Sequence, residues 1–308
     1  MALHGLGKVT LGVPDVDDTI AYYSEFGLDH RGDGVFATAN GGEQLEITRT
    51  PFRRLVELAV AADDHDDIAA VDSRLHKLGL ATVLDDTSVL AVEPVTGTRV
   101  RVGIRPRIVI DPPVTATPYN GPGRIDRWGR APFIARSGPV RPRKLGHAVL
   151  GSTDLPTTMK FFTEGLGFKV SDYMGDHAAF MRCSNEHHNV LVMSAPVNFM
   201  HHTSWQVDDI DEIGRGAQSM LEGHPERHVW GLGRHFAGAN FFWYLKDPAG
   251  NFAEYYSDMD TVSEDDLWSP QVLHGLQGLY AWGPPPPPSF LEPEDLAALM
   301  TGAHSARV

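Results

Sequence analysis

The sequence predicts an α+β protein of four βαβββ modules, paired into two domains that are each an open barrel of mixed strands with flanking helices, followed by a C-terminal tail. Two observations predict this fold. An apolar strand-like segment followed by an acidic helix start occurs four times, beginning near residues 6, 55, 145 and 201. In addition, LGKVTLGVPDVDDTIAYYSEFGL in the first half is similar to LGHAVLGSTDLPTTMKFFTEGLG in the second half, which indicates an internal duplication.

The first two modules each read as a strand, a helix and further strands. The first has a strand at 6–13, a helix at 19–26 that stops at Gly27, and alternating segments at 34–39 and 44–47. The second has a strand at 55–60, a helix that ends near Leu78, and paired strands at 88–94 and 99–104. A proline- and glycine-rich stretch then predicts a linker at 107–143.

The last two modules repeat this order. A strand at 145–152 precedes a helix at 157–164, and a strand at 201–207 precedes a helix that ends near Leu221. The final hairpin pairs 241–245 with 252–256 across a turn at 246–251. We therefore expect domains at 1–106 and 144–260, and a tail or lid at 261–308 that ends in a helix from 292 to 300.

The charge and the cysteine content exclude several classes of function. With 40 acidic and 26 basic residues the net charge is −14, which disfavours nucleic acid and anionic membranes as partners. Cys183 is the single cysteine, so an internal disulfide framework is excluded, and no apolar run is long enough for a membrane span. We expect a cytoplasmic protein.

Glu254 is the first candidate for a metal ligand. In its strand it shares one face with Phe252 and Tyr256, so an inward aromatic face would bury its carboxylate. A buried carboxylate is costly unless a cation meets it, although a salt bridge or a place at the rim is the commoner explanation. His147 and the His201–His202 pair lie in the first strands of the two C-terminal modules. Periodicity alone leaves open which of the two paired histidines faces the carboxylate.

The two halves of the chain differ at these positions. Where the C-terminal half has His147, His202 and Glu254, the first half is expected to have Lys8, Leu55 and Arg101, so only the C-terminal domain can hold a metal. Two imidazoles and one carboxylate are the ligand set of non-haem Fe(II) oxygenases, and Mn(II) accepts the same set.

At this point the residues carry a resemblance to a known family. LGHAVL, HHTSWQV and GRHFAGANFFWYLKDPAGNFAEYY resemble the type I extradiol ring-cleaving dioxygenases of the vicinal oxygen chelate superfamily, nearest to the catechol and homoprotocatechuate 2,3-dioxygenase branch. The resemblance selects His202 from its pair and implies iron ligands at His147, His202 and Glu254. It further implies an acid-base role for His188 in NEHHNVLVM, and contacts of His235 and Tyr244 with substrate and oxygen. Solvated loop positions for His187 and His188, and a plain core position for Tyr244, are the alternatives.

The resemblance also implies an activity. It implies an Fe(II)-dependent enzyme that inserts both atoms of O2 into a catechol-like diol and opens the ring beside the diol, and it implies a homo-oligomer. The chain departs from its relatives at Val149, at Ala237–Gly238, and in lacking an arginine near Trp230 that would hold a substrate carboxylate in the homoprotocatechuate manner, which disfavours a charged substrate. A neutral aromatic substrate is favoured by a set of aromatic residues: Trp205, Phe241, Trp243, Trp268, Tyr280 and Trp282.

Two other functions fit parts of this pattern. An iron-dependent oxygenase of the same superfamily could act on a 2-oxo acid with the same three ligands. A non-catalytic binding or resistance protein of the superfamily would need no metal triad.

Overall fold

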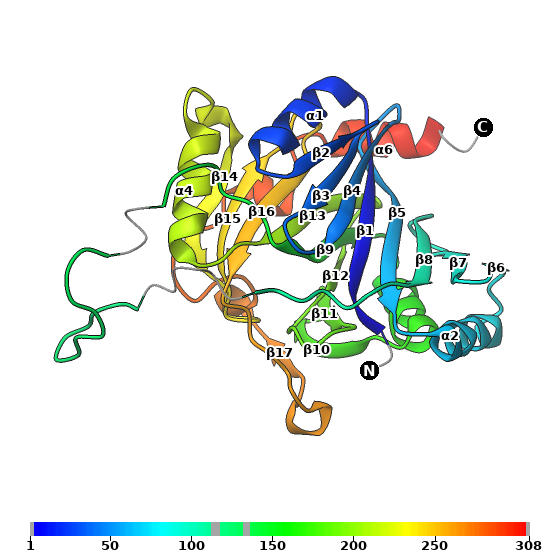
Figure 1. Ribbon diagram of the computed structural model, residues 1–308. Coiled ribbons are helices and arrows are strands. Elements are labelled where there is room, and N and C mark those ends of the chain that lie inside the picture. Colours follow the sequence, from blue (N-terminus) through cyan, green and yellow to red (C-terminus); the bar gives the residue numbers. More distant parts are fainter. Residues whose placement is uncertain (1–2, 112–117, 132–135, 306–308) are drawn as a thin grey trace.

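The computed structural model describes residues 3–111, 118–131 and 136–305. It contains the four expected modules in chain order and confirms the α+β class (Figure 1). The first module comprises β1 (Leu3–Val13), α1 (Val16–Glu25), β2 (Asp29–Gly32), β3 (Val35–Thr38) and β4 (Gly42–Arg49). The second comprises β5 (Arg54–Ala62), α2 (His65–Lys77), β6 (Thr82–Leu84), β7 (Ser88–Val92) and β8 (Arg99–Ile104).

The C-terminal half repeats this order. The third module comprises β9 (Lys144–Ser152), α3 (Leu155–Lys160) with a π-helical continuation (Phe161–Leu166), β10 (Lys169–Met174), β11 (Ala178–Arg182) and β12 (Val190–Ser194). The fourth comprises β13 (Phe199–Gln206), α4 (Ile210–Leu221), a 3-10 turn (Pro225–Arg227), β14 (His228–Arg234), β15 (Phe241–Lys246) and β16 (Phe252–Ser257). The tail adds 3-10 turns at Asp265–Leu267 and Gly275–Gly278, β17 (Gln271–Leu273), α5 (Pro288–Leu291) and α6 (Leu296–Ser305).

An aspartate caps the first helix of every module. The side chains of Asp15, Asp64, Asp154 and Asp209 each accept a hydrogen bond from a backbone N–H in the first turn of α1, α2, α3 and α4. Because Asp15 is the cap, α1 begins at Val16 and not at the expected residue 19. The terminal helix also differs from the prediction. Glu292 has extended backbone angles, so α6 begins only at Leu296.

The strands form two mixed sheets. The N-terminal sheet has the order β2-β3-β4-β1-β5-β8-β7-β6, and the C-terminal sheet has the order β14-β15-β16-β13-β9-β12-β11-β10-β17. In each sheet the first strands of two modules form a central antiparallel pair, β1 with β5 and β9 with β13. Neither sheet closes on itself in the described part of the chain.

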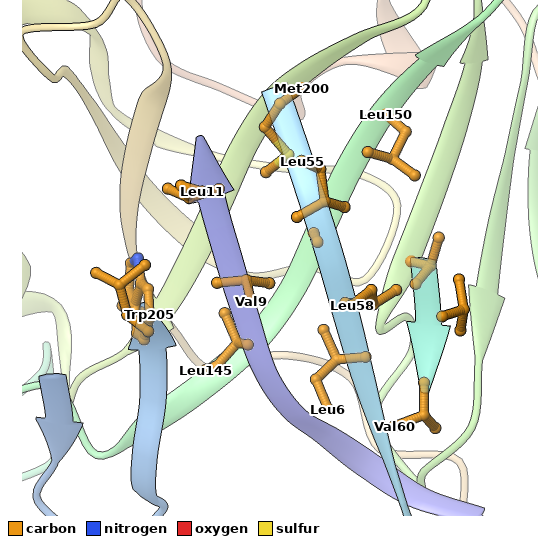
Figure 2. Packing of buried hydrophobic residues seen from close by; sticks show 14 of the residues in the cluster. Leu6, Val9, Leu11, Leu55, Leu58, Val60, Leu145, Leu150, Met200 and Trp205 are labelled. Atoms are coloured by element: carbon orange, nitrogen blue, oxygen red, sulfur yellow. The ribbon is translucent and has the colours of Figure 1, made fainter. Parts of the chain in front are cut away.

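The two halves share a hydrophobic core. Leu6, Val9 and Leu58 from the first half belong to the same buried cluster as Leu145 and Trp205 from the second (Figure 2). Polar contacts join the halves as well, since the Gln44 side-chain oxygen accepts a hydrogen bond from Leu145 N at 2.8 Å. The division of the chain at residues 106, 143 and 260 stays a prediction.

No helix among the described residues is long and apolar enough to cross a membrane.

Candidate metal centre

The register of the C-terminal sheet brings the predicted site residues together. His147 on β9 lies opposite Ser204 on β13, and Ser204 lies opposite Glu254 on β16. The same row continues from Glu254 to Tyr244 on β15 and to Trp230 on β14. His202 lies two residues before Ser204, so the pleat directs it to the same face as that row. The period-2 pattern of the strands therefore places these six side chains on one face of the sheet.

Three donor atoms of the expected ligands face one another. His147 Nε2 lies 3.0 Å from Glu254 Oε2 and 3.4 Å from His202 Nε2, and His202 Nε2 lies 3.7 Å from Glu254 Oε2. Two ligands about 2.1 Å from one ion at a right angle lie roughly 3 Å apart, so these separations fit a shared ion. The three residues are buried and form a group that could hold a metal.

The carboxylate itself also fits a cation. Glu254 is fully buried, and its Oε2 receives no hydrogen bond from the described residues. Burial alone would raise the pKa of Glu254, but the surrounding rings of His147, His235 and His202 hold the pKa below its ordinary value. An ionised carboxylate oxygen without a donor is costly in such an interior unless a positive ion meets it. The donor set thus fits a divalent metal ion, whose identity these residues leave open.

His201 orients the ring of His202. His201 Nε2 lies 2.5 Å from the Phe290 carbonyl, and His201 Nδ1 lies 2.7 Å from His202 Nδ1. A carbonyl only accepts hydrogen bonds, so His201 Nε2 carries a hydrogen. Burial lowers the pKa of His201 to about 4, so its ring is neutral at neutral pH and Nδ1 must accept from His202 Nδ1. His202 Nε2 is then left with a lone pair directed toward Glu254, as a metal ligand requires.

His235 and Tyr244 form a second hydrogen-bonded pair at the site. His235 Nδ1 lies 2.5 Å from the Leu279 carbonyl, and its Nε2 lies 2.9 Å from the Tyr244 hydroxyl and 3.7 Å from Glu254 Oε1. Burial, together with the charge of Glu254, raises the pKa of Tyr244 well above its ordinary value. Tyr244 is therefore a neutral phenol that can hydrogen-bond a bound molecule.

His188 lies beside the predicted ligands. Its ring centroid is 4.3 Å from that of His147, and its side chain lines the same cavity. The alternative of two solvated loop histidines is wrong, because His187 is 0% and His188 4% exposed. Burial is the main reason why the pKa of His188 falls well below its ordinary value, and the nearby histidines add to the effect.

The cavity above these residues is small and mostly apolar. The space open to the centre of a water molecule is about 60 Å³. Its lining contains the predicted histidines and Tyr244 but no lysine or arginine among the described residues. The apolar part of the lining includes Val149, Phe180, Leu191, Trp230, Ala237 and Phe290.

The expected aromatic residues contribute little to this lining. Trp205 and Trp243 are the strand neighbours of Ser204 and Tyr244, so they point to the other face of the sheet and are absent from the lining. Trp205 is part of the core shared by the two halves. Phe241, Trp268, Tyr280 and Trp282 are likewise absent from the lining. The aromatic lining comes from Phe180, Trp230 and Phe290, which the sequence alone did not identify. Phe290 arrives from the tail by long-range packing that no local pattern signals.

The N-terminal half corrects one predicted correspondence. Val149 lies opposite His202, and its counterpart Thr10 lies opposite Glu57, so Glu57 and not Leu55 is the counterpart of His202. The helix caps give the same correspondence, because Glu57 lies seven residues before Asp64 and His202 lies seven residues before Asp209. Glu57 accepts a hydrogen bond from Arg101 at 3.0 Å. An ion pair therefore occupies the place that corresponds to the candidate metal centre.

Comparisons with known proteins agree with this architecture. The profile of the Glyoxalase/Bleomycin resistance protein/Dioxygenase superfamily matches residues 144–255. The chain is 28% identical to Metapyrocatechase 2 of Cupriavidus necator over 313 aligned positions, which cover 94% of this chain and 92% of that protein. The Mn(II)-bound glyoxalase from Novosphingobium aromaticivorans is 25% identical, with a TM-score of 0.70 and coverage of 92% of this chain and 93% of that one.

A third comparison concerns the fold alone. A variant of homoprotocatechuate 2,3-dioxygenase from B. fuscum superimposes with a TM-score of 0.72 at 18% identity, covering 94% of this chain and 81% of that one. The internal duplication, the paired modules and the profile match lead to one assignment. Residues 144–255 form a domain of the Glyoxalase/Bleomycin resistance protein/Dioxygenase superfamily.

Proposed function

We propose that this protein is an Fe(II)-dependent extradiol dioxygenase that opens a catechol-like aromatic diol with O2. The observation that carries the proposal is the cluster of His147, His202 and Glu254 at the base of an apolar cavity, with Oε2 of the buried glutamate lacking a hydrogen-bond donor. The similarity to Metapyrocatechase 2 over nearly the whole of both chains supports the same activity.

The chain's own residues have distinct tasks in this proposal. A bound Fe(II) would hold the two vicinal oxygens of the diol and favour their deprotonated form. His188 takes a proton from a diol hydroxyl and later returns it, as a positioned imidazole can. The Tyr244 hydroxyl can turn to donate a hydrogen bond to an oxygen atom on which negative charge develops. His235, whose Nδ1 donates to the Leu279 carbonyl, holds that hydroxyl at the site through its Nε2. The apolar lining excludes water and holds the ring in a fixed orientation beside these groups.

Iron is the proposed ion and manganese is the alternative. Both metals accept two histidines and one carboxylate, and a solved relative contains Mn(II). Metal-free protein reconstituted separately with each ion, followed by measurement of turnover and bound metal, decides between them. Higher turnover with manganese at equal occupancy would replace iron in the proposal.

Oxygen uptake with a panel of substituted catechols tests the activity. The proposal expects one O2 consumed for each diol and a ring-opened semialdehyde product identified by mass spectrometry. An iron-dependent oxygenase of 2-oxo acids would consume O2 with a 2-oxo acid and not with a catechol. A binding or resistance protein would consume none with either class, and this result would overturn the proposal.

We also propose that the protein works in the cytoplasm as a homo-oligomer. Cys183, the single cysteine, is buried and free, which suits a reducing compartment. Light scattering coupled to gel filtration measures the assembly. A monomer at micromolar concentration would contradict the second part of this proposal.

A further inference from the structure

A chain of three polar side chains leads from β10 to the cavity. Asp172 Oδ2 lies 3.0 Å from His187 Nε2, and His187 Nδ1 lies 3.0 Å from His188 Nδ1. His188 is the residue that lines the cavity beside His147. All three are buried, with exposed fractions of 7% for Asp172, 0% for His187 and 4% for His188. Buried polar groups at these distances are held in a defined arrangement of donors and acceptors.

The direction of the hydrogen bonds follows from the carboxylate of Asp172. An ionised carboxylate only accepts, so His187 Nε2 carries a hydrogen and donates it to Asp172. A His187 ring that carries its single hydrogen on Nε2 has a bare Nδ1, which accepts from His188 Nδ1. His188 is left with a bare Nε2, the form that can take a proton.

We propose that Asp172 and His187 are positioning residues that fix the tautomer and orientation of His188, so that its Nε2 acts as the proton acceptor in the cavity. Asp172 and His187 contact no reacting group themselves. In the proposed reaction, a diol hydroxyl loses its proton to His188 Nε2, the electron pair stays on the diol oxygen, and the same nitrogen later returns the proton. The proton transfer in this inference rests on the proposed function, whereas the tautomer of His188 does not.

Neighbouring side chains confine the ring of His187, the residue that supports His188. The His187 ring packs edge-on against Phe180 and Trp268, with ring centroids 5.6 and 5.3 Å away. A Cβ at Gly238 would lie only 3.1 Å from His187 Nδ1, so the glycine leaves room for this ring. Gly238 has a φ of +79°, which also favours glycine. A ring confined in this way keeps one orientation.

The tail fixes the second oxygen of Asp172. Asp172 Oδ1 accepts a hydrogen bond from Gln271 N on β17 at 2.7 Å. A backbone N–H cannot accept, so this position requires an oxygen. In Asp172→Asn, the amide oxygen must therefore face Gln271, and the NH2 group must face His187. The NH2 group donates, which reverses every hydrogen bond in the chain and places the hydrogen of His188 on Nε2.

Nitrogen NMR on protein with 15N-labelled histidine tests the tautomer directly. Zinc in place of iron keeps the sample diamagnetic, and the variants His187→Gln and His188→Gln identify the two sets of signals. A ring nitrogen that carries a hydrogen resonates well apart from a bare one. We expect His188 to carry its hydrogen on Nδ1 in the native chain and on Nε2 in Asp172→Asn. A native His188 protonated on Nε2 would overturn the proposal whether or not any variant folds.

Kinetics distinguish positioning from plain packing. With the iron-loaded enzyme and a catechol that it cleaves, we expect Asp172→Asn to lower kcat by about 10²-fold or more with little change in KM, a loss typical of general acid-base catalysis. Asp172→Ala removes the acceptor that orients His187 without reversing the hydrogen bonds, so we expect a smaller loss of roughly 10-fold, below the full effect of about 10²–10⁴-fold that general acid-base catalysis contributes. A packing role predicts the opposite order, because asparagine preserves the shape of the side chain and alanine does not.

Asp247→Asn is the matched control. Asp247 is also a buried aspartate, 3% exposed, but it accepts hydrogen bonds from Asn251 in the β15–β16 turn. We expect this variant to keep the native His188 tautomer and the native kcat. Equal losses of kcat in Asp172→Asn and Asp247→Asn would overturn the positioning role. A native enzyme that consumes no O2 with any catechol would refute the proposed function, while the NMR result would still decide the tautomer.

Discussion

Arg53 is hydrogen-bonded to β13, which carries His202, and to the turn that leads into β16, which carries Glu254. Its replacement should lower stability more than the replacement of one side chain usually does. Its guanidinium donates to the Met200 carbonyl at 2.5 Å and to Asn251 Oδ1 at 3.3 Å. It also holds Asp295 of the tail through two hydrogen bonds, of 2.6 and 2.8 Å. Met200 precedes His202 on β13 by two residues, so the contact lies close to the site.

The magnitude of the loss follows from the burial of the partners. In Arg53→Met the methionine keeps most of the apolar packing, because it replaces the aliphatic stem. Met200 and Asn251 are each 1% exposed, and a buried acceptor left unpaired costs about 1–3 kcal/mol. The Asp295 side chain is 36% exposed and can hydrate, so its lost pairing adds little. We expect the free energy of unfolding to fall by roughly 2–5 kcal/mol.

Urea denaturation of the native chain, Arg53→Met and Arg107→Met measures this loss. Arg107 is the matched control because it also pairs with an aspartate, Asp63, but with side chains 59% and 37% exposed. An exposed pair contributes about 0–1 kcal/mol. Limited proteolysis should also cleave the tail of Arg53→Met sooner, because Asp295 loses its anchor. Equal stability of the two arginine variants would refute this reasoning.

Four further outcomes are expected. Elemental analysis should show that Glu254→Ala has lost its bound metal, and retention of the metal by this variant would contradict the ligand assignment. His188→Ala should retain the metal, and its kcat should fall by about 10²–10⁴-fold. Gly146→Ala would place a Cβ 2.1 Å from the hydroxyl of the buried Tyr256, so it should lower the free energy of unfolding by about 1–3 kcal/mol and weaken metal binding measured by titration. Burial raises the pKa of Asp247 from 3.8 to about 6. Because the folded state binds this proton more tightly, the contribution of Asp247 to stability should fall by about 3 kcal/mol as the pH rises from about 3 to about 7, and urea denaturation of Asp247→Asn should lack that component.

Much of the fold could be predicted because its signals lie within short segments of the sequence and occur again in each module. Each module begins with an apolar strand and an aspartate-capped helix, and these signals lie within a few residues of one another. The period of its strand placed Glu254 on one face with Phe252 and Tyr256, and the structure buries that face together with the rest of β16. Strand periodicity is a strong signal when one face of a sheet meets a core.

The remaining features depend on packing between distant parts of the chain. Nothing local to Phe290 indicates that the tail brings its ring and its carbonyl to the site. Asp172 is an ordinary polar residue in the sequence, and its contact with His187 arises only after β10 and the loop before β12 have folded. The repeated histidine doublets, 187–188 and 201–202, were the one available signal for these partners, since in both pairs one ring supports the other.

The wrong correspondence at Leu55 has a different cause. It matched the starts of two apolar segments, near residues 55 and 201, and not the helix caps that follow them. Glu57 lies seven residues before the cap Asp64, as His202 lies seven before the cap Asp209, so counting from the caps selects Glu57, in agreement with the paired register.

Labelling with 18O2 tests the central claim most directly. Iron-loaded native protein is supplied with a catechol that it consumes under 18O2, and the rapidly quenched product is analysed by mass spectrometry. Extradiol cleavage predicts a ring-opened product that contains both labelled atoms, and no such product from Glu254→Ala. A product that retains the ring, or one with no labelled oxygen, would contradict the account.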